Sequence, residues 1–595
     1  MPDPTTAFDP AWRDTPLEQE LLGQVRLDDG WELIERFTTL VRESGSEDER
    51  TAAAWIADRL ASFGVHYRVH EPELFLSVPT SARLELMGDA ATTVSASTPA
   101  FSTSTRPGGV RGSVVHVPSG YATSTVDVFD AGDTGPAPDV AGKIAVTEGF
   151  ANPGKVRRMH ELGAIGVICI NPGDYVHEGI CTPIWGAPDA RNAHEQPQLP
   201  VVAINRPDGD RILALAERGG EVTLQTELDE RWTTCPLVEA TVPGTDASDE
   251  FVLLHGHIDS WFVGIGDNAT GNATMLEIAR VLQENRGRLR RTVKIAWWPG
   301  HSTGRYAGST WYADRFGLEL NEHCIGHVNC DSPGCRDATS YENVMWMAEA
   351  DAVARGAIRD ATGQEATHAR PFRAGDISFN NLGLSTFFML SSEIPGEELG
   401  TRGYYPVGGC GMNIQWHTPH DTLDVADREI LEKDIKVYLL GVLRAANAPL
   451  SPFDYRRTVA EIRDVVAGYA RDAAGEADFG PVESALGDVH ARLEAFYGTD
   501  VDGGRRATVF NTTQRRIGRR LVSLNYSQAG RFRQDPALQI PAVPELASAR
   551  ELPSTHDRHR RRVLRTELAR ACNHVAHQLR EVARDLDAYL DRTRA

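Results

Sequence analysis

The sequence predicts an α/β fold built on a mostly parallel mixed sheet that is flanked by helices. Two apolar runs of strand length, 251–254 and 292–298, lie on either side of a segment whose apolar residues recur at i, i+3, i+4 and i+7 from Met275 to Leu282. Strands that alternate with helices form largely parallel sheets covered on both faces. After about residue 450 long amphipathic segments such as 564–590 replace the strands, which predicts a helical C-terminal domain.

The length predicts several domains, because 595 residues exceed what one hydrophobic core usually supports. A polar, Ser/Thr/Pro-rich run at 92–109 marks the entry to a segment of short strands and turns. We therefore expect an α/β domain formed by residues 1–82 and 233–450, a β-rich insert at 83–232, and a helical domain at 451–595.

The charge balance excludes some classes of partner. The formal net charge of −22 disfavours nucleic acid and anionic membranes, which bind clustered Lys and Arg. The local basic runs at 515–520 and 558–562 are expected to pair with nearby acids on helix faces. No apolar stretch reaches the length of a membrane span, and Met1 to Thr5 shows no signal segment. The eight cysteines are scattered, which favours reduced thiols and a cytoplasmic location.

A helix is expected near the start of the chain. Ser46 and Glu49 have the spacing of a capping box, in which each side chain satisfies a backbone N–H of the other. Apolar residues from Trp55 to Phe63 then form one face, and Gly64 is a natural stop.

The β-rich insert has its own sequence of elements. The predicted strands are 143–146, 165–170 and 200–204, and the predicted helices are 155–162 and 208–218. The motifs "GKIAV", "MHELGAIGVICIN" and "LPVVAI" followed by "DGDRIL" resemble the protease-associated domain of several peptidase families. Within this segment the sequence shows no cluster of metal ligands or nucleophiles, so we expect it to act as a lid or in substrate access.

Residues that ligate metals follow the predicted strands of the α/β domain. His257 and Asp259 follow the first strand, Asp267 precedes the next helix, and Asp331 follows the predicted strand 325–330. A further strand is expected at 385–390, and His417 comes later in the chain. Ligand sites of open α/β sheets collect at the carboxyl ends of the strands, so these side chains are expected to meet.

This order of motifs resembles the co-catalytic zinc peptidases, which include bacterial aminopeptidases, glutamate carboxypeptidase and the transferrin receptor. Their marks are His-x-Asp after a strand, Asp-Asn opening a helix, Glu-Glu before a Gly-Ser turn, a strand-end Asp and a late His-Thr. Four of these marks match His257 with Asp259, Asp267 with Asn268, Asp331, and His417. The order of core, insert and helical domain is similar to the glutamate carboxypeptidase and transferrin receptor branch over nearly the whole chain.

The resemblance implies a role for each matching residue. Asp267 would bridge two metal ions, His257 and Asp331 would complete one metal position, and His417 would hold the second. Asp259 would fix the ring of His257 by a hydrogen bond, which also raises the basicity of the ligand. Zinc is the first expectation for imidazole and carboxylate ligands, as one or two ions, with Mn, Co or Ni as alternatives.

The chain departs from the family pattern at the Glu-Glu pair, where it has His301 and Ser302. In the family the first Glu is the general base and the second is a metal ligand. Three interpretations remain open: His301 acts as the base, since imidazole exchanges protons near neutral pH; it ligates the second metal; or the site holds one metal and does different work. A turn histidine without any of these roles is a further alternative.

Three more residues are candidates for substrate binding. Arg402 and Tyr405 belong to the Gly-rich stretch 395–411, which could shape the pocket, because loops near such sites usually set specificity. Trp416 directly precedes His417. A structural loop and core packing are equally good interpretations of these residues.

The sequence therefore predicts a metal-dependent hydrolase of peptide or amide bonds in small substrates such as an aminoacyl amide, a dipeptide or an N-acyl amino acid. The resemblance also implies a homodimer formed through the helical domain. The alternatives are a non-catalytic, receptor-like metal-binding protein and a metalloenzyme of altered chemistry, a cyclase or lyase.

Overall fold

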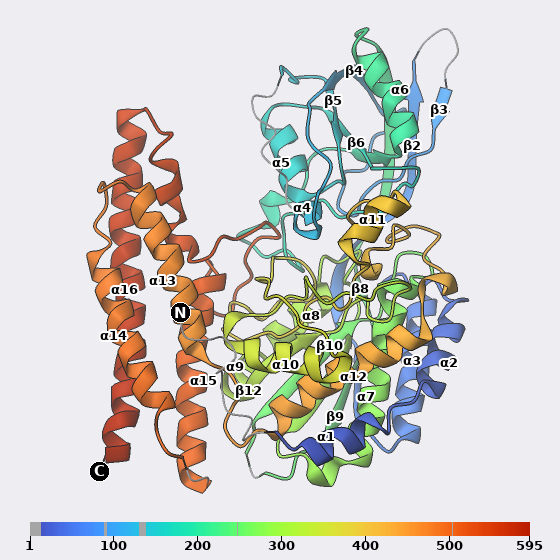
Figure 1. Ribbon diagram of the computed structural model, residues 1–595. Coiled ribbons are helices and arrows are strands. Elements are labelled where there is room, and N and C mark those ends of the chain that lie inside the picture. Colours follow the sequence, from blue (N-terminus) through green and yellow to red (C-terminus); the bar gives the residue numbers. More distant parts are fainter. Residues whose placement is uncertain (1–12, 88–91, 130–137, 247, 502–503, 595) are drawn as a thin grey trace.

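The computed structural model describes residues 13–87, 92–129, 138–246, 248–501 and 504–594. Residues 1–12, on which the expectation about a signal segment rests, lie outside these ranges. Figure 1 shows three parts: an α/β part at the centre, a smaller β-rich part above it, and a bundle of long C-terminal helices beside it. Among the described residues, no helix is long and apolar enough to cross a membrane.

The α/β part is built on a five-stranded mixed sheet with the order β1-β9-β11-β10-β12. Its strands are β1 (His66–His70), β9 (Leu237–Val242), β10 (Phe251–His257), β11 (Thr292–Trp298) and β12 (Cys324–Asn329). β11, β10 and β12 run parallel, whereas β9 is antiparallel to both of its neighbours. The predicted fold class is confirmed.

Both faces of this sheet are buried, so its central strands are apolar throughout. Val252 and Leu254 face a core that includes α7 (Thr270–Glu284), α12 (Arg428–Asn447) and the N-terminal helices. Phe251 and Leu253 face the opposite side, where α8 (Ala307–Arg315) and α9 (Gly317–His323) pack. The remaining helices of this part are α1 (Thr15–Leu22), α2 (Asp28–Phe37), α3 (Glu47–Ser62), α10 (Asp351–Thr362) and α11 (Gly396–Arg402).

The start of α3 differs from the predicted capping box in one bond. The Ser46 hydroxyl accepts a hydrogen bond from the Glu49 N–H, as expected. The Glu49 carboxylate, however, accepts from the N–H of Gly45 and not from that of Ser46. Gly45 has a φ of 78°, which turns its N–H toward the first turn of the helix.

The β-rich part forms a seven-stranded sheet with the order β3-β2-β8-β4-β5-β6-β7. The strands are β2 (Glu73–Leu86), β3 (Thr92–Val94), β4 (Val110–His116), β5 (Ile144–Glu148), β6 (Gly166–Ile170), β7 (Val201–Ile204) and β8 (Glu221–Thr234). Its helices are α4 (Thr125–Phe129), α5 (Pro153–Glu161) and α6 (Arg206–Ala216). The long strands β2 and β8 pair along their lengths and run through the predicted boundaries near residues 82 and 232, so they connect this part to the α/β part.

The C-terminal part contains α13 (Tyr455–Asp472), α14 (Gly480–Tyr497), α15 (Gly504–Tyr526) and α16 (Arg558–Arg594). The basic runs lie on these helices and are largely paired. Arg515 contacts Glu250, Arg516 and Arg520 contact Asp585, and Arg561 contacts Glu476. Pairing with nearby acids is the arrangement that the charge pattern predicts.

The predicted strand at 385–390 is wrong. Thr386 and Phe387 form isolated bridges only, although the segment does lie beside β12. Phe388 has a φ of 71°, which turns the chain out of an extended conformation and prevents a continuous ladder.

Candidate metal centre

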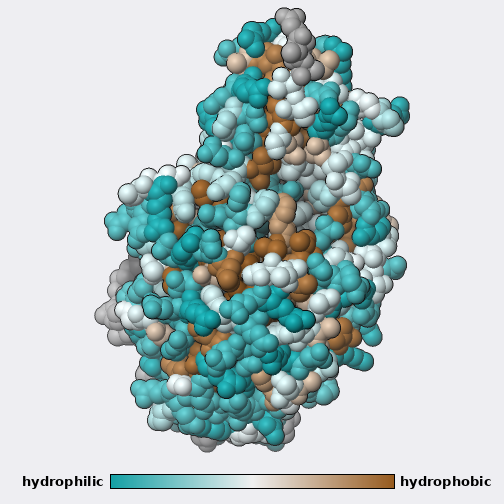
Figure 2. Space-filling model, turned by 90° about the vertical axis from the view of Figure 1, so that its right-hand side faces the viewer, coloured by the Kyte–Doolittle hydropathy of each residue, from teal (hydrophilic) through white to brown (hydrophobic). Residues whose placement is uncertain are grey.

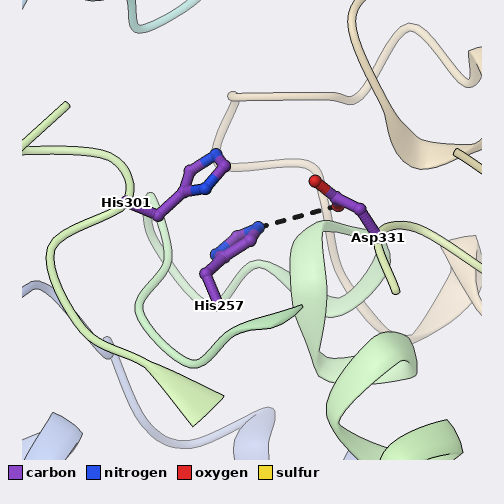
Figure 3. Close-up of side chains that lie close together, drawn as sticks. All are labelled: His257, His301 and Asp331. Carbon is purple, nitrogen blue, oxygen red and sulfur yellow. Dashed lines mark ion pairs between the residues drawn. The ribbon is translucent and has the colours of Figure 1, made fainter. Parts of the chain in front are cut away.

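The predicted ligands meet beyond the carboxyl ends of the parallel strands. His257 is the last residue of β10, Asp331 follows β12 by two residues, and Asp267 lies just before α7. His417 arrives from a loop far along the chain. All four side chains are nearly or fully buried, and Figure 3 shows His257 and Asp331 pointing toward one another.

Asp267 lies between two imidazole rings. Its Oδ1 atom is 2.9 Å from Nε2 of His257, and its Oδ2 atom is 3.1 Å from Nε2 of His417. Asp331 adds a third carboxylate oxygen 3.6 Å from Nε2 of His257. Burial alone would raise the pKa of Asp267, but its hydrogen bonds to the two imidazoles outweigh burial and hold that pKa well below its usual range.

The rings of His257 and His417 are both oriented so that the nitrogen facing Asp267 is the one that carries a lone pair. Nδ1 of His257 donates to the main-chain oxygen of Asp259 over 2.9 Å, and Nδ1 of His417 donates to the main-chain oxygen of Glu178 over 3.0 Å. In a neutral imidazole the other nitrogen, Nε2, is then an acceptor. Because acceptors face carboxylate oxygens here, the arrangement requires either added protons or a cation, and its N and O donors are those that zinc prefers.

Asp259 has a different contact from the one expected. Its carboxylate lies 3.8 Å from Nδ1 of His257, and its main-chain oxygen makes the hydrogen bond instead. The carboxylate accepts from the N–H groups of His301 and Ser302 and from the hydroxyl of Ser44. Asp259 therefore fixes the loop that carries His301, as well as the His257 ring through its backbone.

Two buried side chains hold the loop that carries Asp267. Asn268 donates to the main-chain oxygen of Cys330 and accepts from the N–H of Ser332, which ties this loop to the end of β12. Asp421 accepts from the N–H groups of Gly266 and Asp267 at 2.7 and 3.0 Å. Burial raises the pKa of Asp421 to about 7.

His301 is held by a carboxylate that the sequence did not reveal. Nδ1 of His301 donates to Oδ2 of the fully buried Asp376 over 2.7 Å, and Oδ1 of Asp376 accepts from the hydroxyl of Ser309 over 2.6 Å. Burial alone would raise the pKa of Asp376, but the charge of His301 and its hydrogen bond lower it. Nε2 of His301 is left as the free lone pair of the ring.

The rings of His301 and His257 are stacked, with centroids 3.8 Å apart and planes inclined by 16° (Figure 3). Ligand atoms of His257, His301 and Asp331 lie close enough together to surround one ion. However, an imidazole binds zinc in its own plane at about 2.0–2.1 Å, and two nearly parallel rings cannot both direct their lone pairs to one such point. An ion held by His257 would therefore lie beside the ring of His301 and would not be ligated by it.

Two segments of the chain match models of known protein families. Residues 238–439 match the model described as "Peptidase family M28", and residues 110–212 match the PA domain. The chain combines an M28 peptidase domain with a PA domain. The family expected from the sequence is confirmed.

Curated relatives match parts of the chain. "Aminopeptidase NAALADL1" of Mus musculus is 30% identical over 125 residues, covering 20% of this chain and 17% of its own length. "Carboxypeptidase Q" of Xenopus laevis is 24% identical over 206 residues, covering 32% of this chain and 41% of its own length. These matches therefore span less than half of each relative.

Solved structures show the same fold. The aminopeptidase from Aneurinibacillus sp. strain AM-1 aligns with a TM-score of 0.52 and 20% identity, covering 72% of this chain and 96% of that one. A "Peptidase M28 precursor" from Shewanella amazonensis aligns with a TM-score of 0.54 and 21% identity, covering 73% and 96%.

A pocket of about 740 Å³, including its open mouth, lies over the metal centre. The M28 domain contributes Asp267, His301, Asp331 and His417 to its wall, together with Arg305, Tyr306, Met389, Leu390 and Trp416. The PA domain contributes Val128, Phe129, Phe150 to Pro153, and Glu178 to Ile180. On the face shown in Figure 2, hydrophobic residues gather where the narrower upper part meets the wider lower part. The pocket is therefore shared by the two domains.

Of the three predicted substrate-binding residues, only Trp416 lines this pocket, where its ring stacks on His417 with centroids 3.7 Å apart. Arg402 ends α11 at the surface, pairs with Asp337 and Glu398, and is not among the residues that line the pocket. Tyr405 is outside the pocket wall too. Its hydroxyl lies 2.9 Å from Nε2 of His177 in the PA domain, so it joins the two domains.

The PA domain also reaches the metal centre directly. The backbone of Glu178 makes two hydrogen bonds with His417, one to its main-chain oxygen and one from its ring. Glu178 is one of the residues that line the pocket, and burial raises the pKa of its carboxyl group to about 8. Sequence reasoning missed Glu178 and Asp376, because they lie 239 and 75 residues from the histidines they contact and in no recognisable motif.

Proposed function

We propose that this protein is a metal-dependent hydrolase of peptide or amide bonds in small substrates. The observation that carries the proposal is the pair of Nε2 atoms facing the two oxygens of Asp267, with Asp331 beside them. The four candidate ligands lie together, and three of them, Asp267, Asp331 and His417, line the pocket, which favours an enzyme over a receptor-like binding protein. The similarity to M28 peptidases supports the same reaction class.

The residues that would hold zinc are His257, Asp267, Asp331 and His417, with Mn, Co or Ni as alternatives. We propose two ions, because the two oxygens of Asp267 face different imidazoles. Ser302 stands where the family has a carboxylate ligand, and its N–H is bound to Asp259. When bound, the metal supplies a Lewis acid that polarises an amide carbonyl and makes water a better nucleophile.

His301 is proposed to take and return the proton during hydrolysis. Its Nδ1 proton is held by Asp376, which fixes the tautomer and leaves Nε2 as the acceptor at the pocket wall. A buried carboxylate that orients an imidazole and stabilises its protonated form is the arrangement that general-base histidines use. The dyad would thus replace the carboxylate base of the family.

The test is a screen of zinc-loaded protein against dipeptides, aminoacyl amides and N-acyl amino acids, with His301→Ala and His301→Glu as variants. We expect the wild type to hydrolyse at least one class and His301→Ala to lose roughly 100-fold or more in kcat. His301→Glu restores the family's residue and should recover part of this loss. Bound metal without hydrolysis of any amide would contradict the proposal and point to cyclase or lyase chemistry.

We also propose that two copies pair through the C-terminal helical domain and that the protein acts in the cytoplasm. The long helix α16 carries Val563, which is 41% exposed, on the surface of this part. All eight cysteines lie in the described chain, and each is buried and unpaired, which suits a reducing compartment. Light scattering of the full chain tests the dimer, and fractionation of the native host tests the location.

A further inference from the structure

Arg305 is a buried arginine in the wall of the pocket over the metal centre. It lies in the turn between β11 and α8, four residues after His301, and its side chain is among the buried ones, with 5% of the residue exposed. The same turn therefore delivers both His301 and a guanidinium to one cavity.

The guanidinium of Arg305 differs from those of the other buried arginines in its lack of partners. Among the residues that the structure describes, Arg305 makes no side-chain hydrogen bond or ion pair, and its Nε atom is buried without an acceptor. The other buried arginines are Arg42, Arg280, Arg291, Arg373, Arg444 and Arg519, and each of them donates at least two hydrogen bonds. A buried cation without a counter-charge is costly, so this position is suited to an anion that arrives with a ligand.

Tyr306 and Arg373 are the groups whose contacts with Arg305 can be described. Its guanidinium carbon lies 5.0 Å from the ring centroid of Tyr306, and the charge of Arg305 acts on the nearby Arg373. Burial lowers the pKa of Arg373 to about 10, and the like charge of Arg305 adds to that effect. A second cation therefore lies near Arg305, which adds to the cost of leaving Arg305 without a counter-charge.

The turn holds the backbone of Arg305 in an unfavourable conformation, and this conformation sets the position of the Arg305 side chain. Arg305 and Tyr306 have φ values of 49° and 69°, in the left-handed region that non-glycine residues rarely adopt. The main-chain oxygen of Arg305 accepts from Gly186, and the N–H of Tyr306 donates to the main-chain oxygen of His301. Such conformations persist where the surrounding structure enforces them, commonly at ligand sites.

We propose that Arg305 binds a free carboxylate of the substrate while the amide lies at the metal centre. A guanidinium presents a planar set of N–H donors that fits a carboxylate in two parallel hydrogen bonds. The neighbouring wall is apolar, with Phe129, Phe150, Met389 and Leu390. The substrate class is thus a dipeptide or N-acyl amino acid with a free carboxylate and an apolar side chain. This inference rests on the proposed function.

The test compares acids with their matching neutral amides. The kcat and KM of zinc-loaded wild type, Arg305→Gln and Arg305→Lys are measured on Leu-Leu, Leu-Leu-amide, N-acetyl-leucine and N-acetyl-leucinamide. The surface variant Arg211→Gln serves as the matched control. We expect the wild type to prefer the acids, and Arg305→Gln to lose roughly 10- to 100-fold on the acids, chiefly in KM, and little on the amides. Arg305→Lys should be intermediate.

An equal loss on acids and amides would overturn the inference, as would a wild type that prefers the amides. Binding of N-acetyl-leucine and N-acetyl-leucinamide to the same proteins is also measured by calorimetry. This measurement distinguishes failure of the carboxylate contact from failure of the proposed function. If the wild type hydrolyses none of the four compounds, the proposed function fails on this panel. In that case, the carboxylate contact is upheld if the wild type binds N-acetyl-leucine and Arg305→Gln does not. It is overturned if the two proteins bind N-acetyl-leucine equally.

Discussion

The Nδ1 atom of His301 lies 2.7 Å from the Oδ2 atom of Asp376, and the carboxyl group of Asp376 is fully buried. This contact fixes which nitrogen of His301 carries the proton and turns the other toward the pocket. In the proposed function, His301 held by Asp376 takes the place of the carboxylate base that the resemblance implies. The predictions below follow from this contact and from the contacts that hold the metal ligands.

Asp376→Asn should impair catalysis without removing metal. Asparagine preserves the shape but loses the charge that stabilises protonated His301, so kcat should fall by roughly 10- to 1,000-fold. The pH profile of kcat should shift as well, which a merely structural role would not produce. Ser309→Ala is the matched control, because Ser309 donates to the other oxygen of Asp376 and should have a smaller effect. An unchanged kcat in Asp376→Asn would contradict the role given to His301.

Arg42→Met should loosen the loop that leads to Asp267. The buried guanidinium of Arg42 donates to the main-chain oxygens of Ile258, Val263 and Gly264. Its removal leaves buried carbonyls without donors, which costs about 1–3 kcal/mol for each group that finds no other partner. We expect a lower Tm and weaker zinc binding, measured by calorimetry. Arg59→Met is the control, because Arg59 is only half-buried and does not contact this loop. Equal effects of the two variants would refute this explanation.

Acid should weaken the contact between the PA domain and the M28 domain at His177. This ring donates to the main-chain oxygen of Trp416 and accepts from the hydroxyl of Tyr405. Burial lowers the pKa of His177 to about 3, whereas an unfolded histidine titrates near about 6.5. The stability it contributes is therefore complete above about pH 6.5 and is lost as the pH falls toward 3, by about 1.4 kcal/mol per pH unit.

Hydrogen exchange of residues 171–181 in the metal-free protein checks this prediction, at pH 7.5 and pH 5 with correction for the intrinsic rates. Protection should fall at pH 5 in the wild type and change less in His177→Gln. A pH dependence that is the same in both proteins would assign the effect to another group.

The cluster of candidate metal ligands could be predicted from the sequence because most of them belong to local motifs beside strands. His257, Asp267 and Asp331 follow from strand ends, and apolar strands such as β10 and β11 are distinct in the sequence. The geometry brings these residues and His417 together, as expected. The family and the α/β fold, which are both confirmed, could also be predicted from these local motifs and apolar strands.

Contacts between distant loops could not be predicted in this way. Asp376 and Glu178 lie in segments without periodicity, and only tertiary packing brings them to His301 and His417. The Gly-rich stretch around Arg402 suggested a place in the pocket, but the ion pairs with Asp337 and Glu398 hold Arg402 at the surface, outside the pocket wall. A residue's partners in space, and not its neighbours in sequence, decided these cases.

The central claim is that His257, Asp267, Asp331 and His417 hold the metal while His301 stands beside it. Elemental analysis of metal per subunit in wild type, His301→Ala and His417→Ala, purified without added metal and again after incubation with zinc, tests it most directly. We predict two ions in the wild type, the same number in His301→Ala, and a loss in His417→Ala. A loss in His301→Ala would make His301 a ligand, and a wild type that binds no metal even with zinc supplied would contradict the claim as a whole.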